Sequence, residues 1–356
     1  MGKTPSSARA WATCPTRAPA NAGCISTSGA EIPTSIPACC SRPAQPTATT
    51  RNALAAVCMT LLACLLGTPL SLATADAAGS EVASGVSPNI AAFRGVVAWR
   101  GHTTGANYAL YVREDARTRR IPGVSATQEF SFDVGPDGHG GATVVLTQCR
   151  GGHCRLYAVD GDRRGIHPLA AKAAEPSSPS VWGSRIAFLS KSNRITLGRT
   201  DRGSTQNGPA GTLGDDTGPL ALALRGTTLA FAWRGTLGSC TTQTNPDGQR
   251  TEIFVAQQGS TPRLVTVGCE AGPVTGVSLI GWVGSDLLLN ETLADGTSRL
   301  RLISAGGKTL KTGPLPGGDV QDIAADGGTL YYTVRDGSRS RLMRSKAALA
   351  AYTSGS

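Results

Sequence analysis

What this chain of 356 residues most clearly lacks is a catalytic motif. It contains no Gly-x-Ser-x-Gly string, which argues against the nucleophile elbow of a serine hydrolase; a string such as that around Ser278 lacks the second glycine. Only one of its four histidines, His153, lies four residues from another metal-ligating residue type, Cys149. We therefore predict no catalytic residue, no metal site and no cofactor, and we favour a protein that is not an enzyme.

Charged residues are also scarce, at 16% of the chain. The carboxylates cannot be assigned to acid–base chemistry, because aspartates in turn-like settings usually accept hydrogen bonds from their own backbone. The aspartates interpreted in this way are Asp133, Asp137, Asp215, Asp216, Asp286, Asp319, Asp322 and Asp326. A less favoured alternative is that Asp215 with Asp216, or Asp319 with Asp322, holds a cation together with carbonyl oxygens.

Aromatic residues make up only 5% of the chain, and no stretch alternates them with basic residues, so we predict no nucleic-acid partner. The formal net charge is nevertheless +10. Its short basic clusters are Arg117, Arg119 and Arg120; Arg163 and Arg164; and Arg339, Arg341 and Arg344. A solvated basic surface is the favoured interpretation, and a patch for an anionic polymer such as a cell-wall glycan, or for lipid headgroups, is the alternative.

The first 78 residues differ from the rest of the chain. Residues 1–50 are rich in Ala, Pro, Ser and Thr without an apolar period, which predicts a disordered leader, or a segment assigned to the protein through a wrong start codon. Residues 51–78 combine Arg51, an apolar run over 53–73 and small-residue sites, the pattern of a signal peptide cleaved after Ala75 or Ala77.

Two alternatives for residues 51–78 stay open. The apolar run is long enough to span a membrane uncleaved as a signal anchor, which would be the protein's only membrane contact. The string Leu61-Leu62-Ala63-Cys64 resembles a lipobox, although apolar residues continue after Cys64. All three interpretations place the folded part outside the cytoplasm, as a secreted or cell-envelope protein.

Ten cysteines are present, and only four of them follow residue 78: Cys149, Cys154, Cys240 and Cys269. Four cysteines allow three pairings, and proximity in the sequence favours Cys149–Cys154 and Cys240–Cys269. Cys149, His153 and Cys154 could alternatively ligate a metal, but no fourth ligand is evident nearby. Disulfides form only outside a reducing cytosol, in agreement with export.

Six short apolar strands, each following a glycine-containing turn, recur through the region 85–346. Their approximate centres are Val97, Val145, Ala187, Ala230, Leu288 and Tyr331, at intervals of 48, 42, 43, 58 and 43 residues. A period near 43 residues is that of a four-stranded propeller blade, and the longest interval predicts an inserted loop between Cys240 and Gly248. We predict an all-β, six-bladed β-propeller of four-stranded antiparallel blades, followed by a tail over 347–356; a β-sandwich is the main alternative.

One repeat resembles a known family. The string from Phe130 to Gly138 (FSFDVGPDG), followed by an apolar strand at 144–147 and a second strand ending in Asp160, resembles the blade of TolB-like propellers, which have WD40-like repeats. Gly135 replaces the usual Ser of the family signature, and residues 139–142 are extra. The resemblance implies a six-bladed propeller exported in bacteria and used for protein binding, and it implies no chemistry.

The expected function is therefore that of an exported, non-catalytic binding module at the cell envelope, with a protein or a cell-envelope glycan as its partner. We expect a monomer. The first alternative is a carbohydrate-processing lyase or hydrolase, in which carboxylates and arginines would meet at the central mouth of the propeller. The second alternative is a structural envelope protein without a ligand.

Overall fold

The computed structural model describes residues 79–103, 107–124, 126–172, 174–211, 218–236 and 238–346, all within a compact unit that spans Leu70–Ser356. The predicted leader, the signal segment with Ala75 and Ala77, and the tail at 347–356 lie outside the described residues. Within the described part no helix is long and apolar enough to cross a membrane.

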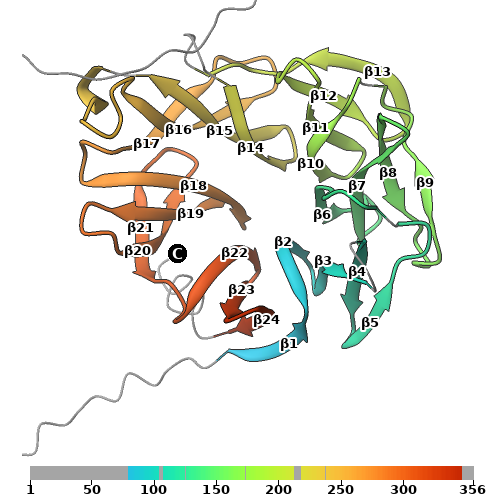
Figure 1. Ribbon diagram of the computed structural model, residues 1–356. Coiled ribbons are helices and arrows are strands. Elements are labelled where there is room, and N and C mark those ends of the chain that lie inside the picture. Colours follow the sequence, from blue (N-terminus) through green and yellow to red (C-terminus); the bar gives the residue numbers. More distant parts are fainter. Residues whose placement is uncertain are drawn as a thin grey trace, which may run out of the picture. The chain divides into compact units, whose positions relative to one another are not determined.

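The described part is all-β: six four-stranded antiparallel sheets form a ring of blades (Figure 1). Blade 1 consists of β2 (Val86–Phe93), β3 (Val96–His102), β4 (Tyr108–Glu114) and β5 (Arg117–Arg120). Blade 2 consists of β6 (Phe132–Pro136), β7 (Ala142–Arg150), β8 (His153–Val159) and β9 (Ile166–Pro168). Blade 3 consists of β10 (Ser177–Trp182), β11 (Arg185–Leu189), β12 (Ile195–Arg199) and β13 (Arg202–Asn207). Blade 4 consists of β14 (Gly218–Arg225), β15 (Thr228–Thr236), β16 (Gln249–Gln257) and β17 (Arg263–Cys269). Blade 5 consists of β18 (Val274–Val283), β19 (Asp286–Leu293), β20 (Ser298–Ser304) and β21 (Thr309–Pro314). Blade 6 consists of β22 (Asp319–Asp326), β23 (Thr329–Asp336), β24 (Arg339–Ser345) and β1 (Ser80–Ser84).

The six apolar strands of the repeat occupy equivalent places, because each is the second strand of its blade: β3, β7, β11, β15, β19 and β23. The six-bladed fold predicted from the 43-residue period is thereby confirmed. The recurring glycine lies in the turn between the first and second strands. Gly226 and Gly327, for example, have φ values of 59° and 55°, a left-handed conformation that glycine adopts without steric cost.

Neighbouring blades bury their apolar faces against each other. Successive side chains of a strand point to opposite faces, so Val144 and Leu146 of β7 pack toward blade 1, whereas Val145 packs toward blade 3. The buried apolar residues of the described part form six clusters, and each cluster combines side chains of two adjacent blades. This packing explains why the second strands are apolar on both faces.

The ring is closed by a strand from the other end of the described chain. β1 pairs with β24 as the outermost strand of blade 6, with Ser80 opposite Arg344 and Ser84 opposite Arg341 (Figure 1). The propeller thus starts at Ser80, ahead of the boundary at residue 85 predicted from the repeats. A single strand separated from its own blade carries no repeat signal, so the periodicity could not show it.

Both favoured cysteine pairs are joined by disulfides. Cys149–Cys154 links β7 to β8 across their hairpin, and Cys240–Cys269 links the connection between β15 and β16 to the end of β17. That connection is the inserted loop of the 58-residue interval, and it contains a short 3₁₀ helix, η1 (Gly238–Cys240).

The two disulfides should differ in their contribution to stability. Cys240–Cys269 spans 29 residues and Cys149–Cys154 spans 5. Loop-closure entropy then predicts a loss of about 3.5 kcal/mol for a Cys240→Ser, Cys269→Ser variant and about 2 kcal/mol for the Cys149→Ser, Cys154→Ser variant. Urea unfolding of both variants against the parent measures the difference, and an equal loss in the two would contradict the prediction.

Candidate functional site

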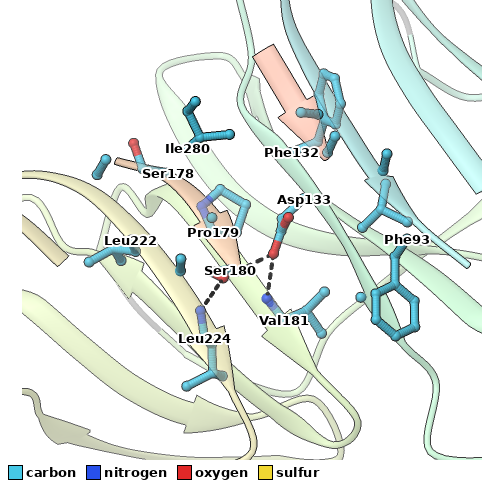
Figure 2. A pocket seen from close by; sticks show the side chains of 18 of the residues that line it. Phe93, Phe132, Asp133, Ser178, Pro179, Ser180, Val181, Leu222, Leu224 and Ile280 are labelled. Carbon is cyan, nitrogen blue, oxygen red and sulfur yellow. Dashed lines mark hydrogen bonds between the residues drawn. The ribbon is translucent and has the colours of Figure 1, made fainter. Parts of the chain in front are cut away.

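The first strands of the blades surround a central cavity of about 250 Å³. Its wall is largely backbone and apolar side chains, including Phe93, Phe132, Leu222 and Ile280 (Figure 2). Among the described residues that line this cavity, Asp133 supplies the carboxylate and no arginine is present. A glycoside hydrolase needs a pair of carboxylates flanking the scissile bond, and this cavity does not provide one.

The Asp133 carboxylate links neighbouring blades. Its Oδ2 atom accepts hydrogen bonds from the Ser180 hydroxyl at 2.9 Å and from the Val181 backbone N–H at 2.8 Å, both on β10 (Figure 2). Ser180 Oγ in turn accepts the backbone N–H of Leu224 on β14 at 2.9 Å. These bonds join blades 2, 3 and 4 beside the cavity, so the side chain has a structural role.

Burial raises the pKa of Asp133 to about 6, because removal from water disfavours the carboxylate more than its hydrogen bonds from Val181 and Ser180 favour it. A folded-state pKa above the usual value of 3.8 means that the folded protein binds the proton more tightly than the unfolded chain. The contribution of Asp133 to stability is therefore fully present below the unfolded pKa of 3.8 and is lost as the pH rises through about 6, a total change of about 3 kcal/mol.

This pH dependence can be measured with an Asp133→Asn variant, which keeps an oxygen acceptor but does not titrate. The free energy of unfolding of wild type minus that of the variant should fall by about 2 kcal/mol between pH 4 and pH 6.5. Asp322 titrates in both proteins, so its effect cancels. Asp137→Asn is the matched control. Backbone N–H donors hold the pKa of the Asp137 carboxyl below its usual value, so the free energy of unfolding of wild type minus that of this variant should rise, not fall, with pH. A difference that stays flat for Asp133 would contradict the assignment.

Two further buried groups link blades beside the central cavity. The Oδ2 atom of Asp322, on β22, accepts the backbone N–H groups of Asn89 and Ile90 on β2 at 2.9 and 2.8 Å, and burial raises the pKa of this carboxyl. The Arg100 guanidinium, which is 4% exposed, donates to the carbonyl oxygens of Phe130 and Pro88. These bonds join blade 6 to blade 1 and blade 1 to blade 2.

A serine and a histidine also lie within hydrogen-bond distance. Ser87 Oγ is 3.0 Å from His102 Nε2, the spacing of a nucleophile and its base. Ser87 is only 3% exposed, however, and it lines none of the cavities found among the described residues. A buried hydroxyl cannot reach a substrate, so this contact ties β2 to β3.

Two clefts away from the axis are larger than the central cavity. One, of about 530 Å³, lies between blades 3 and 4 and is lined by hydroxyl and amide side chains over an aliphatic floor. The other, of about 630 Å³, lies between blades 1 and 2 and brings together two of the basic clusters, with Arg117 and Arg119 facing Arg163 and Arg164. Glu114, Asp115 and Asp162 line this second cleft too, so its charge is mixed.

The sequence-predicted candidates have different outcomes. Cys149 and Cys154 are joined to each other, so they offer no thiolates to a metal, and within the described part no three His, Cys, Asp or Glu side chains gather as a metal site requires. Asp215 and Asp216 lie outside the described residues. Asp319 accepts a hydrogen bond from Gln321, whereas Asp322 accepts backbone N–H groups of β2, so the two carboxylates have separate partners.

The turn-like setting predicted for Asp133 and Asp322 was wrong. Both lie inside first strands, β6 and β22, and accept backbone N–H groups of the next blade. Sequence reasoning missed these links, although one signal was present: each aspartate directly precedes an aliphatic residue of its strand, Val134 or Ile323. A charged residue within an apolar strand indicates a buried, hydrogen-bonded group.

Comparison with known proteins gives structural likenesses only. No protein-family model matches the chain, and no curated protein does. The similar solved structures include the β-propeller domain of the Trilobed protease from Pyrococcus furiosus, at 9% identity, covering 71% of this chain and 79% of that one, with a TM-score of 0.45. They also include TolB from Acinetobacter baumannii, at 14% identity, covering 62% of this chain and 55% of that one, with a TM-score of 0.38. These likenesses concern the propeller architecture, which the strand order of this chain already shows.

Proposed function

We propose that this protein is an exported, non-catalytic propeller that binds a protein partner at the cell envelope. The observation that carries the proposal is the central cavity. Its wall is mostly apolar side chains and backbone, and its carboxylate, Asp133, is engaged in bonds between blades. Chemistry in a propeller would need several polar groups converging in such a cavity, whereas a binding module needs only a rigid surface.

Export is supported by two independent features. The apolar run and the small-residue sites at Ala75 and Ala77 have the order of a signal peptide. The described cysteines are all paired, and structural disulfides persist in oxidising compartments. Cleavage after Ala77 would leave β1, which begins at Ser80, attached to the propeller. Free thiols at Cys240 and Cys269 in protein isolated from the cell exterior would contradict this part of the proposal.

The binding function is tested by capture from intact cells. The full chain, tagged at its C-terminus, is produced in its own host and treated with a membrane-impermeant crosslinker before purification. We expect one partner, in near-stoichiometric amount, that an exported control protein of similar charge with the same tag does not capture. Recovery of nothing beyond the control, or cleavage of envelope glycans by the purified protein, would overturn the proposal.

A further inference from the structure

Each blade has one outer strand whose free edge could pair with another chain, and proteins usually protect such edges. β5 carries three exposed arginines, and β9 is three residues long and ends in a proline. β21 contains Lys311 and Pro314. β1 has an irregular register, and the Arg113 side chain binds its Val82 carbonyl. Gly307 of the next blade lies against the Val265 carbonyl of β17.

β13 lacks such protection over residues 204–207; at its start, Gly203 lies near the carbonyl oxygen of Ala170. All six of its residues are exposed, and after Arg202 its sequence is Gly-Ser-Thr-Gln-Asn, with no charge and no proline. It hydrogen-bonds β12 in its sheet, and no described strand pairs with its other side. The backbone N–H of Gly208 donates to Ile195 of β12, so the alternation of the strand directs the N–H groups of Thr205 and Asn207 toward the open edge.

The open edge lies along the cleft between blades 3 and 4. Four consecutive residues, 204–207, line this cleft. Successive residues of a strand face opposite sides, so a cleft that reaches all four extends around the strand's edge rather than covering one face. An extended segment in the cleft could therefore pair with the backbone of β13 while its side chains contact the cleft wall.

The cleft wall indicates which side chains such a segment would carry. Aliphatic groups of Leu197, Leu224 and Leu229 form the floor, where one apolar side chain would fit. The described lining includes Arg185 and Arg199 and no carboxylate. Arg199 is paired with Asp201, whereas Arg185 donates to the neutral side-chain oxygen of Gln258 and forms no ion pair with any described residue. An acidic side chain would complement this charge.

We infer that the open edge of β13, with the cleft beside it, docks an extended segment of a partner protein that carries an acidic and an aliphatic side chain. The segment adds to blade 3 as a fifth strand. Main-chain hydrogen bonds supply most of the affinity, and Arg185 supplies selectivity for acidic sequences. This inference rests on the proposed binding function and assigns it a site.

Two positions give a matched pair of test variants. Thr205→Pro removes an edge N–H of β13 without touching the bonds to β12. Thr118→Pro does the same on β5, because the N–H of Ile121 donates to Leu110 of β4 and the alternation then points the Thr118 N–H outward. Both substitutions fall on edge positions, where proline is tolerated. Equal melting temperatures of the two variants verify that neither proline disrupts its blade more than the other.

The probe is a fluorescein-labelled peptide, Thr-Val-Glu-Val-Thr-Thr, titrated against the intact exported protein by fluorescence anisotropy. We expect Thr205→Pro to weaken binding by about tenfold or more, whereas Thr118→Pro leaves it unchanged. Arg185→Gln should remove the preference for this peptide over the same peptide with lysine in place of glutamate. The peptide should also slow hydrogen exchange at the amides of Thr205 and Asn207.

Several results would overturn the inference: no binding of the probe, equal binding to the Thr205→Pro variant, equal binding of a backbone N-methylated probe, or exchange protection elsewhere. A dimer that Thr205→Pro dissociates, without any effect on the peptide, would assign the edge to a second copy instead. If the Thr205→Pro protein captures the same partner from intact cells as the wild type, the edge site fails while the proposed function stands. If the wild type captures nothing, the proposed function itself fails.

Discussion

Replacing Glu291 by alanine is expected to lower the free energy of unfolding by about 4 kcal/mol. This glutamate of β19 is fully buried, and its two carboxylate oxygens accept from Arg301 Nη1 at 2.6 Å and from Arg299 Nε at 2.9 Å. Arg301 Nη1 also lies 3.3 Å from the Thr266 hydroxyl of β17, so the network joins blade 5 to blade 4. Without Glu291, the Arg301 side chain, only 17% exposed, loses its counter-charge.

The control for this prediction is an exposed ion pair. Arg164 and Asp162 have side chains that are 85% and 58% exposed, so Asp162→Ala should change stability by less than about 1 kcal/mol. A Glu291→Leu, Arg301→Met double variant should recover much of the loss, because it removes both buried charges together. Urea unfolding measures the free energy of unfolding of the three variants against that of the wild type. A Glu291→Ala protein as stable as the Asp162→Ala protein would show that the network contributes little.

Deleting residues 79–84, and with them β1, is expected to cost about 5 kcal/mol and to broaden the unfolding transition. The deletion removes the ladder to β24 and the packing of Val82 and Ala83 against the cluster shared by blades 6 and 1. It also exposes the edge of β24 and separates the first blade from the last, so the ring loses its closure.

A truncation of residues 347–356 serves as the control, because it removes none of the described strands. Thermal unfolding followed by circular dichroism compares the two truncations, both made in protein that begins at Ala78. The control should melt as the parent does. If the deletion of β1 also left the melting temperature within about 2 °C of the parent, blade 6 would not depend on this strand, since 5 kcal/mol corresponds to a shift of more than about 10 °C.

The central cavity and the cleft of blades 3 and 4 could be predicted much less well than the blades. A strand such as Leu229–Trp233 is recognisable from its own residues, because an apolar run after a glycine turn is a local pattern. The bond between Asp322 and the backbone of Asn89 joins residues 233 positions apart, and no local pattern encodes it. The same holds for the cleft, whose lining extends from Arg185 to Pro262.

The sequence by itself determined the number of blades, the identity of each blade's second strand and the glycine turns that precede these strands, because these depend on side-chain alternation and on backbone freedom over a few residues. Only the tertiary structure decided that β1 completes blade 6, that Asp133 and Asp322 tie first strands together, and that β13 keeps an open edge beside a cleft whose described lining contains no carboxylate. These features arise where segments distant in the chain come into contact. The free energy of these contacts depends on which side chains the closed ring brings together.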